Sequence, residues 1–595
     1  MKPLKAKAAD LILPARLRAL LPRLPLFAGL TVKELDRILK EVDWFSLPGG
    51  WTLMRRGQEE DSLYVVTAGQ LGLFLPGADG RDEMAGQLGP GDTVGEISVL
   101  SGSPRTATLI ALRDTELLRM SHEAFERIAA RHPTILRNLA GLVAGRLRRI
   151  MEGRRDPREG HMRARTIAIL RLQRDLPHAD VADALATALS RGGRSVVVLD
   201  KADRAADTEW FHNLESENEH VLYLGSLDDE GWTRLCLRQA DRVILIGFPD
   251  PPPPDLMQIE QLLYRGPRRY TELVLLHPPT APRGQGAAAW VKRLAPDFHH
   301  NLRIGNAADL GRLARHVAGR AVGLVLAGGG ARGFAHLGVI KALKEEGLVF
   351  DLVGGTSMGA IIGAGVAADW SYDELEQRLR RSFIETNPLD DYTVPLISFV
   401  RGRKVVKLLQ DNFGDSLIEE SWLPYFCVSS NLSQGRETVH RTGPVWQALR
   451  ASVAIPGVLP PVVREGEILV DGAVMENFPV GIMADMARGP VIGIDLEAHH
   501  VFASQLTAWK KGPPWGVLGD TMKGGPDIVS LLMRAGTVNS EAQTIRNHAR
   551  ADLVLAPPVD KIGIRAWRAF DKAIETGYEY TQKALETADL SPFRI

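Results

Sequence analysis

A serine between two closely spaced glycines constrains this chain of 595 residues more than any other feature. Gly355-Thr356-Ser357-Met358-Gly359 follows the apolar pair at 352–353 and precedes a run of small apolar residues at 360–368. This order predicts a strand, a tight turn and a buried helix. A serine in such a turn projects its hydroxyl from a strained corner at a helix N-terminus, where the helix dipole favours negative charge. Ser357 is therefore a candidate nucleophile.

A glycine-rich loop lies upstream of this serine, between an apolar strand pattern at 322–327 and a helical pattern at 334–343. Backbone N–H groups in such a loop can hold a phosphate or stabilise the oxyanion of an acyl-transfer reaction. Downstream, a short predicted strand at 467–470 delivers Asp471, and Gly472 then permits a sharp turn. The loop consists of Gly328, Gly329, Gly330, Ala331, Arg332 and Gly333.

The same loop also satisfies the dinucleotide fingerprint Gly-x-Gly-x-x-Gly through Gly328, Gly330 and Gly333. That fingerprint requires an acidic residue at the end of the second strand. The nearby candidate, Asp351, begins the second predicted strand and so would lie at the wrong edge of the sheet. The sequence therefore favours an oxyanion loop.

These three motifs, in this order, resemble those of the patatin-like phospholipases, and the resemblance extends over about residues 320–585. It implies an α/β hydrolase domain with a Ser–Asp dyad, in which Ser357 is the nucleophile and Asp471 the base that accepts its proton. It also implies that the loop from Gly328 to Gly333 forms the oxyanion hole, with Arg332 helping to fix it.

A catalytic triad with a histidine stays open, because His499 and His500 follow Asp471 in the chain order of ordinary α/β-hydrolases. We interpret them as loop residues, and His336 as a packing residue behind the glycine loop. Residues 371–425 and 498–545 are expected to shape the acyl channel.

The N-terminal third has short strand patterns at 51–54, 62–66 and 71–75, separated by glycine turns. They predict a small β-barrel or jelly roll. We expect an amphipathic helical segment at 27–45 before these strands, and a helix at 123–149 to end the domain.

The stretch from Val94 to Ala107 resembles the phosphate-binding cassette of cyclic-nucleotide-binding domains. The resemblance implies that Arg105 pairs with a cyclic phosphate, as a guanidinium does well, and that Glu96 accepts a hydrogen bond from a ribose hydroxyl. Gly95, Ser98 and Thr106 would complete the polar nest. The alternative is a barrel kept for docking and assembly, without a nucleotide.

Strand patterns at 194–200, 220–224, 242–247 and 273–277 alternate with helical ones and predict a small parallel α/β domain in the middle of the chain. A barrel, an α/β region and a patatin-like region, in this order, resemble neuropathy target esterase and its bacterial relatives. We therefore predict three domains, at 15–150, 163–318 and 320–595.

Composition narrows the class of protein further. Lys plus Arg and Asp plus Glu both number 72, so nothing favours binding to nucleic acid. Cys236 and Cys427 stand far apart without metal-ligand spacing, which suits a cytoplasmic protein without a metal or cofactor. No apolar run is long enough to span a bilayer. Peripheral contact with the inner membrane surface stays open through the basic N-terminus or the arginine-rich stretch at 146–165.

The sequence predicts a serine hydrolase that cleaves fatty-acyl esters of phospholipids or lysophospholipids and is modulated by a cyclic nucleotide. The alternative is a cyclic-nucleotide sensor or docking protein whose hydrolase domain is inactive.

Overall fold

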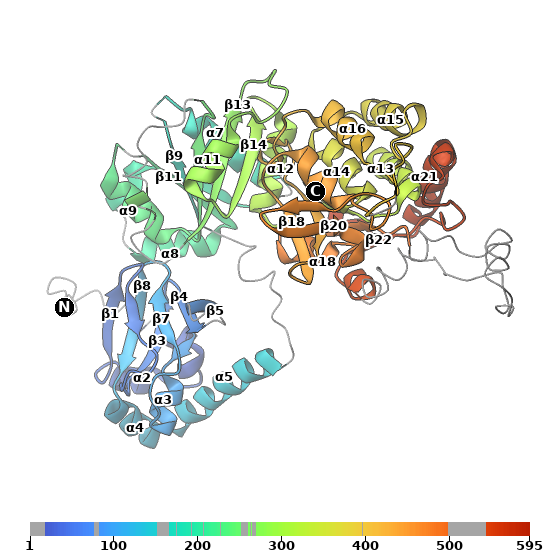
Figure 1. Ribbon diagram of the computed structural model, residues 1–595. Helices are drawn as coiled ribbons and strands as arrows, with labels where there is room; N and C mark the ends of the chain where they lie inside the picture. Colours follow the sequence, from blue (N-terminus) through green and yellow to red (C-terminus); the bar gives the residue numbers. More distant parts are fainter. Residues whose placement is uncertain are drawn as a thin grey trace, which may run out of the picture. The chain divides into compact units, whose positions relative to one another are not determined.

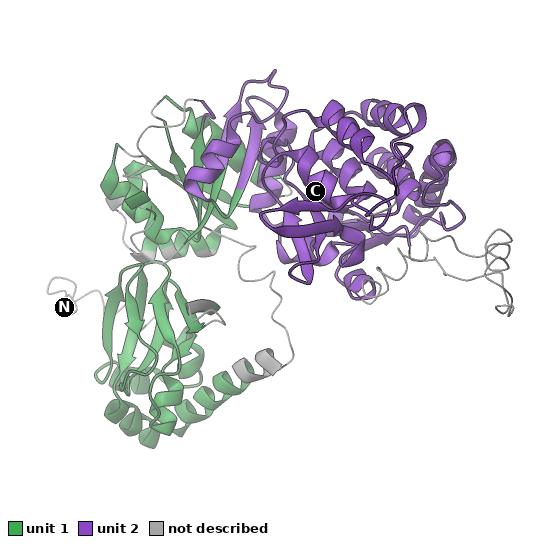
Figure 2. Ribbon diagram, viewed as in Figure 1, with its two compact units in different colours: residues 1–247, 253–273, 296–298 green, residues 248–252, 274–295, 299–595 purple. Residues whose placement is uncertain are grey.

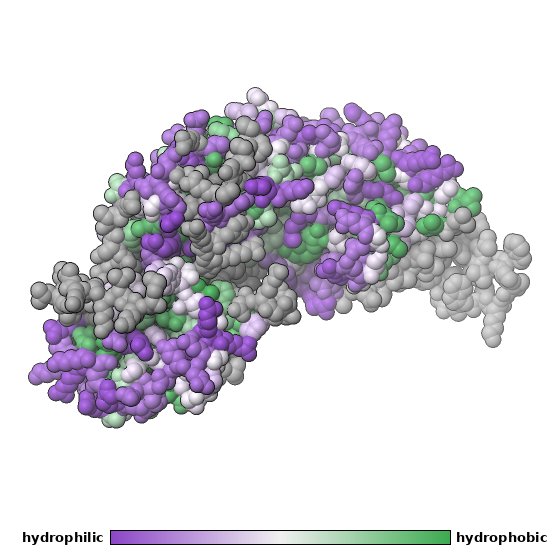
Figure 3. All heavy atoms as spheres, turned by 60° about the vertical axis from the view of Figure 1, so that its left-hand side comes forward, coloured by the Kyte–Doolittle hydropathy of each residue, from purple (hydrophilic) through white to green (hydrophobic). Residues whose placement is uncertain are grey.

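The chain forms two compact units in the computed structural model (Figures 1 and 2). Unit 1 comprises residues 1–247, 253–273 and 296–298, and unit 2 comprises residues 248–252, 274–295 and 299–595. Hydrophilic side chains are widespread on the described surface in Figure 3. The structure describes residues 18, 20–76, 82–151, 166–173, 175–191, 193–205, 208–226, 228–250, 260–261, 263, 269–394, 397–497 and 543–594.

The N-terminal part of unit 1 is a jelly roll of two antiparallel sheets, ordered β1-β8-β3-β6 and β2-β7-β4-β5, which confirms the predicted barrel. Side chains from both sheets, among them Val66 and Leu71, pack in one buried cluster. The elements are α2 (Val32–Ile38), β1 (Asp43–Leu47), β2 (Thr52–Met54), β3 (Leu63–Ala68), β4 (Leu71–Pro76), β5 (Asp82–Leu88), β6 (Thr93–Val94), α3 (Glu96–Ser101), β7 (Thr108–Ala111) and β8 (Thr115–Met120), followed by α4 (His122–Arg131) and α5 (Pro133–Met151).

Two expectations for this part were wrong in detail. Residues 43–45 belong to strand β1, where they pair with β8, instead of ending a helix. The helix expected at 123–149 is two helices, α4 and α5, which are separated at His132. Pro133 explains the break, because proline lacks the N–H that a continuing helix needs but is well suited to a first helical position.

The rest of unit 1 contains four parallel strands in the order β10-β11-β9-β12, as expected for a parallel α/β domain. Strand β9 (Thr166–Arg171) was not predicted, although it lies between β11 and β12 and its first five residues are buried. The other elements are α7 (His178–Leu189), β10 (Val196–Leu199), α8 (Thr208–Glu217), β11 (His220–Gly225), α9 (Glu230–Gln239) and β12 (Arg242–Gly247).

Unit 2 is built around a mixed sheet in the order β19-β20-β17-β16-β15-β21-β22, with β18 paired to β17. Its first elements are α11 (Ala287–Leu294), β14 (Phe298–Arg303), α12 (Ala307–Val317), β15 (Gly323–Leu326), α13 (Ala335–Glu345), β16 (Leu352–Thr356) and α14 (Met358–Ala367). Then follow α15 (Tyr372–Arg380), α16 (Arg403–Phe413), β17 (Tyr425–Asn431), β18 (Arg436–His440), α17 (Val445–Ser452), β19 (Val462–Arg464), β20 (Glu467–Asp471), α18 (Val480–Asp485), β21 (Val491–Ile494), β22 (Leu553–Leu555) and α21 (Phe570–Leu585).

The different lengths of the strands bring the end of β16, before Ser357, close to the end of β20, at Asp471. Strand β17 runs parallel to β16 and continues beyond it, so that Thr356 pairs with Val428 while β17 extends to Asn431. Strand β20 pairs antiparallel with the last residues of β17, and Asp471 lies opposite Ser429. The end of β20 therefore reaches the level at which β16 ends. No helix among the described residues is long and apolar enough to cross a membrane.

Candidate active site

Ser357 occupies a strained turn between β16 and α14. Its φ is 54° and its ψ is −120°, a conformation that costs a non-glycine residue free energy and is typical of a nucleophile elbow. A Cβ atom at Gly359 would lie 2.2 Å from the carbonyl oxygen of Leu326, and one at Gly355 would lie 2.6 Å from that of Gly359. Both glycines are therefore needed because backbone segments pass too close for a side chain.

The backbone of the serine is fixed by a residue that the sequence analysis did not single out. The amide of Ser357 donates a hydrogen bond to Oγ of Ser452 at 3.0 Å. The Ser452 hydroxyl in turn donates to the carbonyl of Val428 at 2.6 Å. Ser452 is fully buried.

The hydroxyl of Ser357 contacts the carboxylate of Asp471 directly. Oγ of Ser357 donates to Oδ2 of Asp471 at 2.7 Å, although the residues are 114 positions apart. Oδ1 of Asp471 accepts the Ala473 amide at 2.9 Å. Burial raises the pKa of Asp471 to about 7, against the hydrogen bonds from Ser357 and Ala473, and the negative charge of Glu497 raises it further. A carboxylate with a pKa near neutrality suits a general base.

Two of the described histidines, His336 and His548, have other partners. Nε2 of His336 lies 2.8 Å from the carbonyl oxygen of Ala327, and burial lowers the pKa of His336 to about 4, so its ring is neutral. This geometry agrees with a packing role. His548 pairs with Asp495 at 2.7 Å. His499 and His500 lie outside the described residues, as does most of the expected 498–545 channel segment.

The glycine loop uses several of its six amides for its own fold. The amide of Gly328 donates to the carbonyl of Asn477 at 3.3 Å, and that of Ala331 donates to Ile564 at 2.9 Å. The amide of Arg332 donates to the carbonyl of Gly329 at 3.2 Å, within the loop itself. The amides of Gly329 and Gly330 have no acceptor among the described residues.

Two side chains support this loop. The Arg332 side chain donates from Nε to the carbonyl of Ile562 at 2.8 Å, which ties the loop to a distant part of the chain. Asn477, which the sequence patterns did not single out, is buried beside Gly328. A Cβ atom at Gly328 would lie 2.5 Å from Oδ1 of Asn477 and 3.2 Å from Cβ of Ser357. The loop and the serine thus approach one another closely.

The rejected dinucleotide interpretation has no support from Asp351. This residue lies directly before β16, at the end of the strand opposite to Ser357. It is fully buried and paired with Arg315, so it is not available to a ribose beside the loop. No cluster of metal-binding side chains occurs within the described ranges.

In unit 1, Arg105 of the cassette points into the barrel. Its guanidinium donates to the carbonyls of Ser62 at 2.7 Å and Gly95 at 3.4 Å, while its Nε finds no acceptor among the described residues. Gly95 is the N-cap residue directly before α3 and has a φ of 83°, and a Cβ there would lie 2.2 Å from Nη1 of Arg105. Glu96 and Ser98 are buried, and Thr106 is exposed.

Comparison with known proteins finds three family models in this chain. A cyclic nucleotide-binding domain matches residues 44–132, a Neuropathy Target Esterase family P-loop like domain matches 163–318, and a patatin-like phospholipase matches 324–484. An uncharacterized NTE family protein of Mycobacterium tuberculosis is 31% identical over 96% of this chain and 96% of its own length.

Two further matches are partial: in one this chain spans less than half of the relative, and in the other the match covers about a quarter of this chain. A protein named lysophospholipase nte1 from Aspergillus oryzae is 30% identical over 97% of this chain, which spans 43% of that protein. The crystal structure of a cyclic nucleotide-binding domain from Methylobacillus flagellatus is 21% identical over 24% of this chain and 84% of that domain, with a TM-score of 0.22.

Proposed function

This chain belongs to the NTE family of patatin-like phospholipases, and from that premise we propose that it is a serine hydrolase of phospholipid and lysophospholipid acyl esters. The observation that carries the proposal is the direct hydrogen bond of 2.7 Å between Ser357 and Asp471. The fungal relative named as a lysophospholipase supports the choice of substrate class.

In the proposed reaction, Oγ of Ser357 attacks the ester carbonyl while its proton passes to Asp471. The carbon–oxygen bond to the lysophospholipid or glycerol alcohol then breaks, and that alcohol takes the proton from Asp471. Water next attacks the acyl-enzyme, again giving a proton to Asp471, which returns it to Ser357 as the fatty acid leaves. The amides of Gly329 and Gly330, which have no acceptor among the described residues, are the proposed oxyanion donors, because the amides of Gly328, Ala331 and Arg332 have partners.

Release of fatty acid from lysophosphatidylcholine tests this function. Ser357→Ala and Asp471→Asn should each abolish release, and a fluorophosphonate probe should label the wild type but not Ser357→Ala. Circular dichroism of both variants controls for folding. Fatty-acid release that survives Ser357→Ala would refute the assignment.

The same assay decides between the dyad and a triad with a histidine. In the dyad, His499→Ala and His500→Ala keep most of the turnover, whereas in the triad one of them removes as much activity as Asp471→Asn. The remaining alternative, a sensor or docking protein with an inactive hydrolase domain, requires that no acyl ester is turned over while a cyclic nucleotide binds tightly.

We further propose that the barrel binds a cyclic nucleotide through Arg105. Its Nε has no acceptor among the described residues, which supports this proposal, because a buried donor without an acceptor is costly and a phosphate oxygen could satisfy it. Glu96 would accept from the ribose, and Gly95, Ser98 and Thr106 would line the phosphate nest. Titration calorimetry with cAMP and cGMP tests this, and Arg105→Ala should abolish binding. Binding without any change in hydrolysis rate would refute modulation of the enzyme.

Two segments at 391–394 and 397–401, which pair through Tyr392 and Val400 and are called the hairpin below, are our proposed contact with the lipid surface. Tyr392, Val394 and Ile397 are 68%, 73% and 72% exposed, which is unusual for large apolar side chains in so short a segment. The amide of Phe399 donates to the carbonyl of Gly457 at 2.9 Å. Three residues before Gly457, the carbonyl of Ala454 accepts the amide of Asp471 at 2.9 Å. The hairpin is thus connected to the site.

Charge at the end of the hairpin supports an anionic surface, because Arg401 and the following Arg403, Lys404 and Lys407 are exposed, and of these Lys404 pairs with Asp390 at 2.5 Å. Val394→Asp should lower co-sedimentation with vesicles that contain phosphatidylglycerol, and should lower hydrolysis of vesicle lipid relative to a soluble short-chain ester. Val463→Asp is the matched control, because Val463 is 69% exposed and lies on β19, outside residues 391–401. Equal loss in both variants would contradict the contact.

A further inference from the structure

Ser357 lies between strand β16 and helix α14, and a carboxylate stands at the far end of each of these two elements. Strand β16 leads up to the serine and helix α14 leads away from it, so both elements have their far ends on the side away from the hydroxyl. Asp351 directly precedes β16, and Asp369 comes two residues after α14. Asp369 has a φ of 62°, so the chain leaves the helix through a strained residue.

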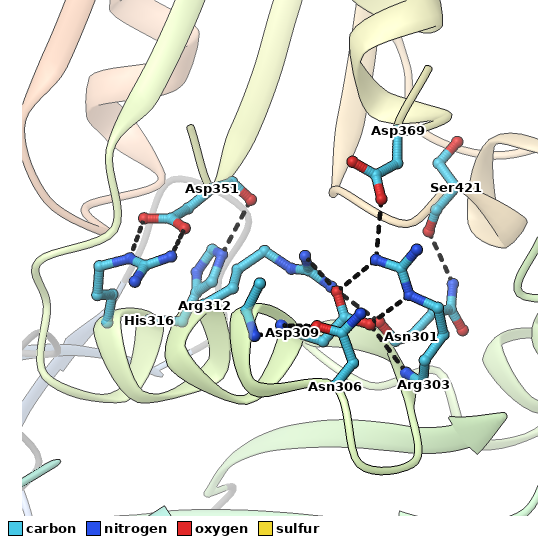
Figure 4. Close-up of polar contacts among 11 residues, drawn as sticks. Asn301, Arg303, Asn306, Asp309, Arg312, His316, Asp351, Asp369 and Ser421 are labelled. Carbon is cyan, nitrogen blue, oxygen red and sulfur yellow. Dashed lines mark hydrogen bonds and ion pairs between the residues drawn. The ribbon is translucent and has the colours of Figure 1, made fainter. Parts of the chain in front are cut away.

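The first carboxylate is held by helix α12. Arg315 donates from Nε and Nη2 to the two oxygens of Asp351 at 2.8 and 2.6 Å (Figure 4). Asp351 is fully buried and also accepts the amide of Val322, which begins the approach to β15, at 2.9 Å. A buried carboxylate with this geometry depends strongly on its partner.

The second carboxylate is held from the end of β14. Nη2 of Arg303 donates to Asp369 at 2.9 Å, and the same guanidinium makes two further bonds to the buried Asp309 of α12 (Figure 4). Arg312 also donates to Asp309, at 2.9 Å. The guanidinium of Arg303 is therefore fixed in place before it contacts Asp369.

We infer that Arg303 and Arg315 are positioning residues for Ser357, acting through Asp369 and Asp351. The inference rests on the proposed hydrolase function. Helix α14 has 10 residues and is roughly 15 Å long, so a tilt of about 4° at its base moves the serine by about 1 Å. A displacement of that size can cost about 100-fold in rate. These arginines precede residues 324–484, the part that matches the patatin-like model.

Asp369→Asn is the main test, because it removes the ion pair while asparagine tolerates a positive φ and the side chain of Asp369 is 46% exposed. Asp415→Asn is the matched control. Asp415 accepts two hydrogen bonds from Arg283, but it lies outside β16 and α14. We expect Asp369→Asn to lower kcat and the fluorophosphonate labelling rate of Ser357 about tenfold with KM unchanged, and Asp415→Asn to leave them unchanged.

A graded pair completes the test. Arg315→Lys keeps one charge without the fork and should retain more of the labelling rate than Arg315→Met, measured at a temperature at which circular dichroism shows both variants folded. Equal kcat in Asp369→Asn and Asp415→Asn, or melting temperatures that fall without any change in kcat, would overturn the inference while leaving the hydrolase intact. A wild type that neither hydrolyses lipid esters nor reacts with the probe would instead refute the proposed function itself.

Discussion

The pKa of Asp471 makes both rate and stability depend on pH in opposite directions. Only the carboxylate can accept a proton from Ser357, and the pKa is raised to about 7 by burial. Below about pH 7 we therefore expect kcat/KM to fall about tenfold per pH unit. Asp471→Asn should remove activity at every pH.

The same shift has a defined sign for stability. The folded protein binds this proton more tightly than the unfolded chain, whose pKa stays at the ordinary 3.8. The contribution to stability is therefore fully present below pH 3.8 and is lost as pH rises through about 7. A change from 3.8 to about 7 corresponds to about 4 kcal/mol.

Urea unfolding of the wild type and Asp471→Asn at pH 4 and pH 8 measures this loss. Asparagine cannot ionise, so the variant lacks this pH-dependent loss. Between pH 4 and pH 8, the free energy of unfolding of the wild type should therefore fall by about 4 kcal/mol more than that of Asp471→Asn. Burial also raises the pKa of Glu476 to about 7, but this residue is present in both proteins and its effect cancels in the difference. Parallel loss of stability in the two proteins, or a wild-type rate that is flat between pH 6 and 8, would refute the reasoning.

Three further predictions concern residues around the nucleophile and the core. Ser452→Ala leaves the buried Ser357 amide without its acceptor and should lower kcat about tenfold with little effect on KM, so an unchanged kcat would show that the bond is dispensable. Gly359→Ala places a methyl 2.2 Å from a carbonyl oxygen and should lower the free energy of unfolding by more than about 3 kcal/mol, measured by urea unfolding. Burial raises the pKa of the Cys427 thiol to about 12, so Cys427 and the buried Cys236 should react with Ellman's reagent only in denaturant, and rapid reaction of the folded protein would contradict their burial.

Sequence patterns predicted the elements whose signals are local. The strand before Ser357, the turn and the buried helix were expected from apolar runs and glycines, and β16 and α14 match them closely. The jelly roll and the parallel strands were expected for the same reason. Strand β14 was missed, because Phe-His-His-Asn-Leu-Arg has no apolar run or alternation that marks a strand.

The candidate site was predictable in its residue types but not in its support. Chain order and family resemblance brought Ser357 and Asp471 together, whereas Ser452 gave no local sign that its hydroxyl would fix the nucleophile's amide. The loop from Gly328 to Gly333 was predicted as a unit. Only the tertiary structure shows which of its backbone amides are hydrogen-bonded, because the acceptors for Gly328 and Ala331 are the carbonyls of the distant Asn477 and Ile564.

By itself, the sequence determined where the backbone must turn tightly and which side chains stand at those turns, because turn geometry and hydrophobic period act over a few residues. Tertiary structure alone decided the proton affinity of Asp471 and the ion pairs at the two ends of the β16–α14 element, which Arg315 of α12 and Arg303 at the end of β14 provide. These properties depend on burial and on charges brought together from distant parts of the chain, and desolvation has no signature in a local pattern.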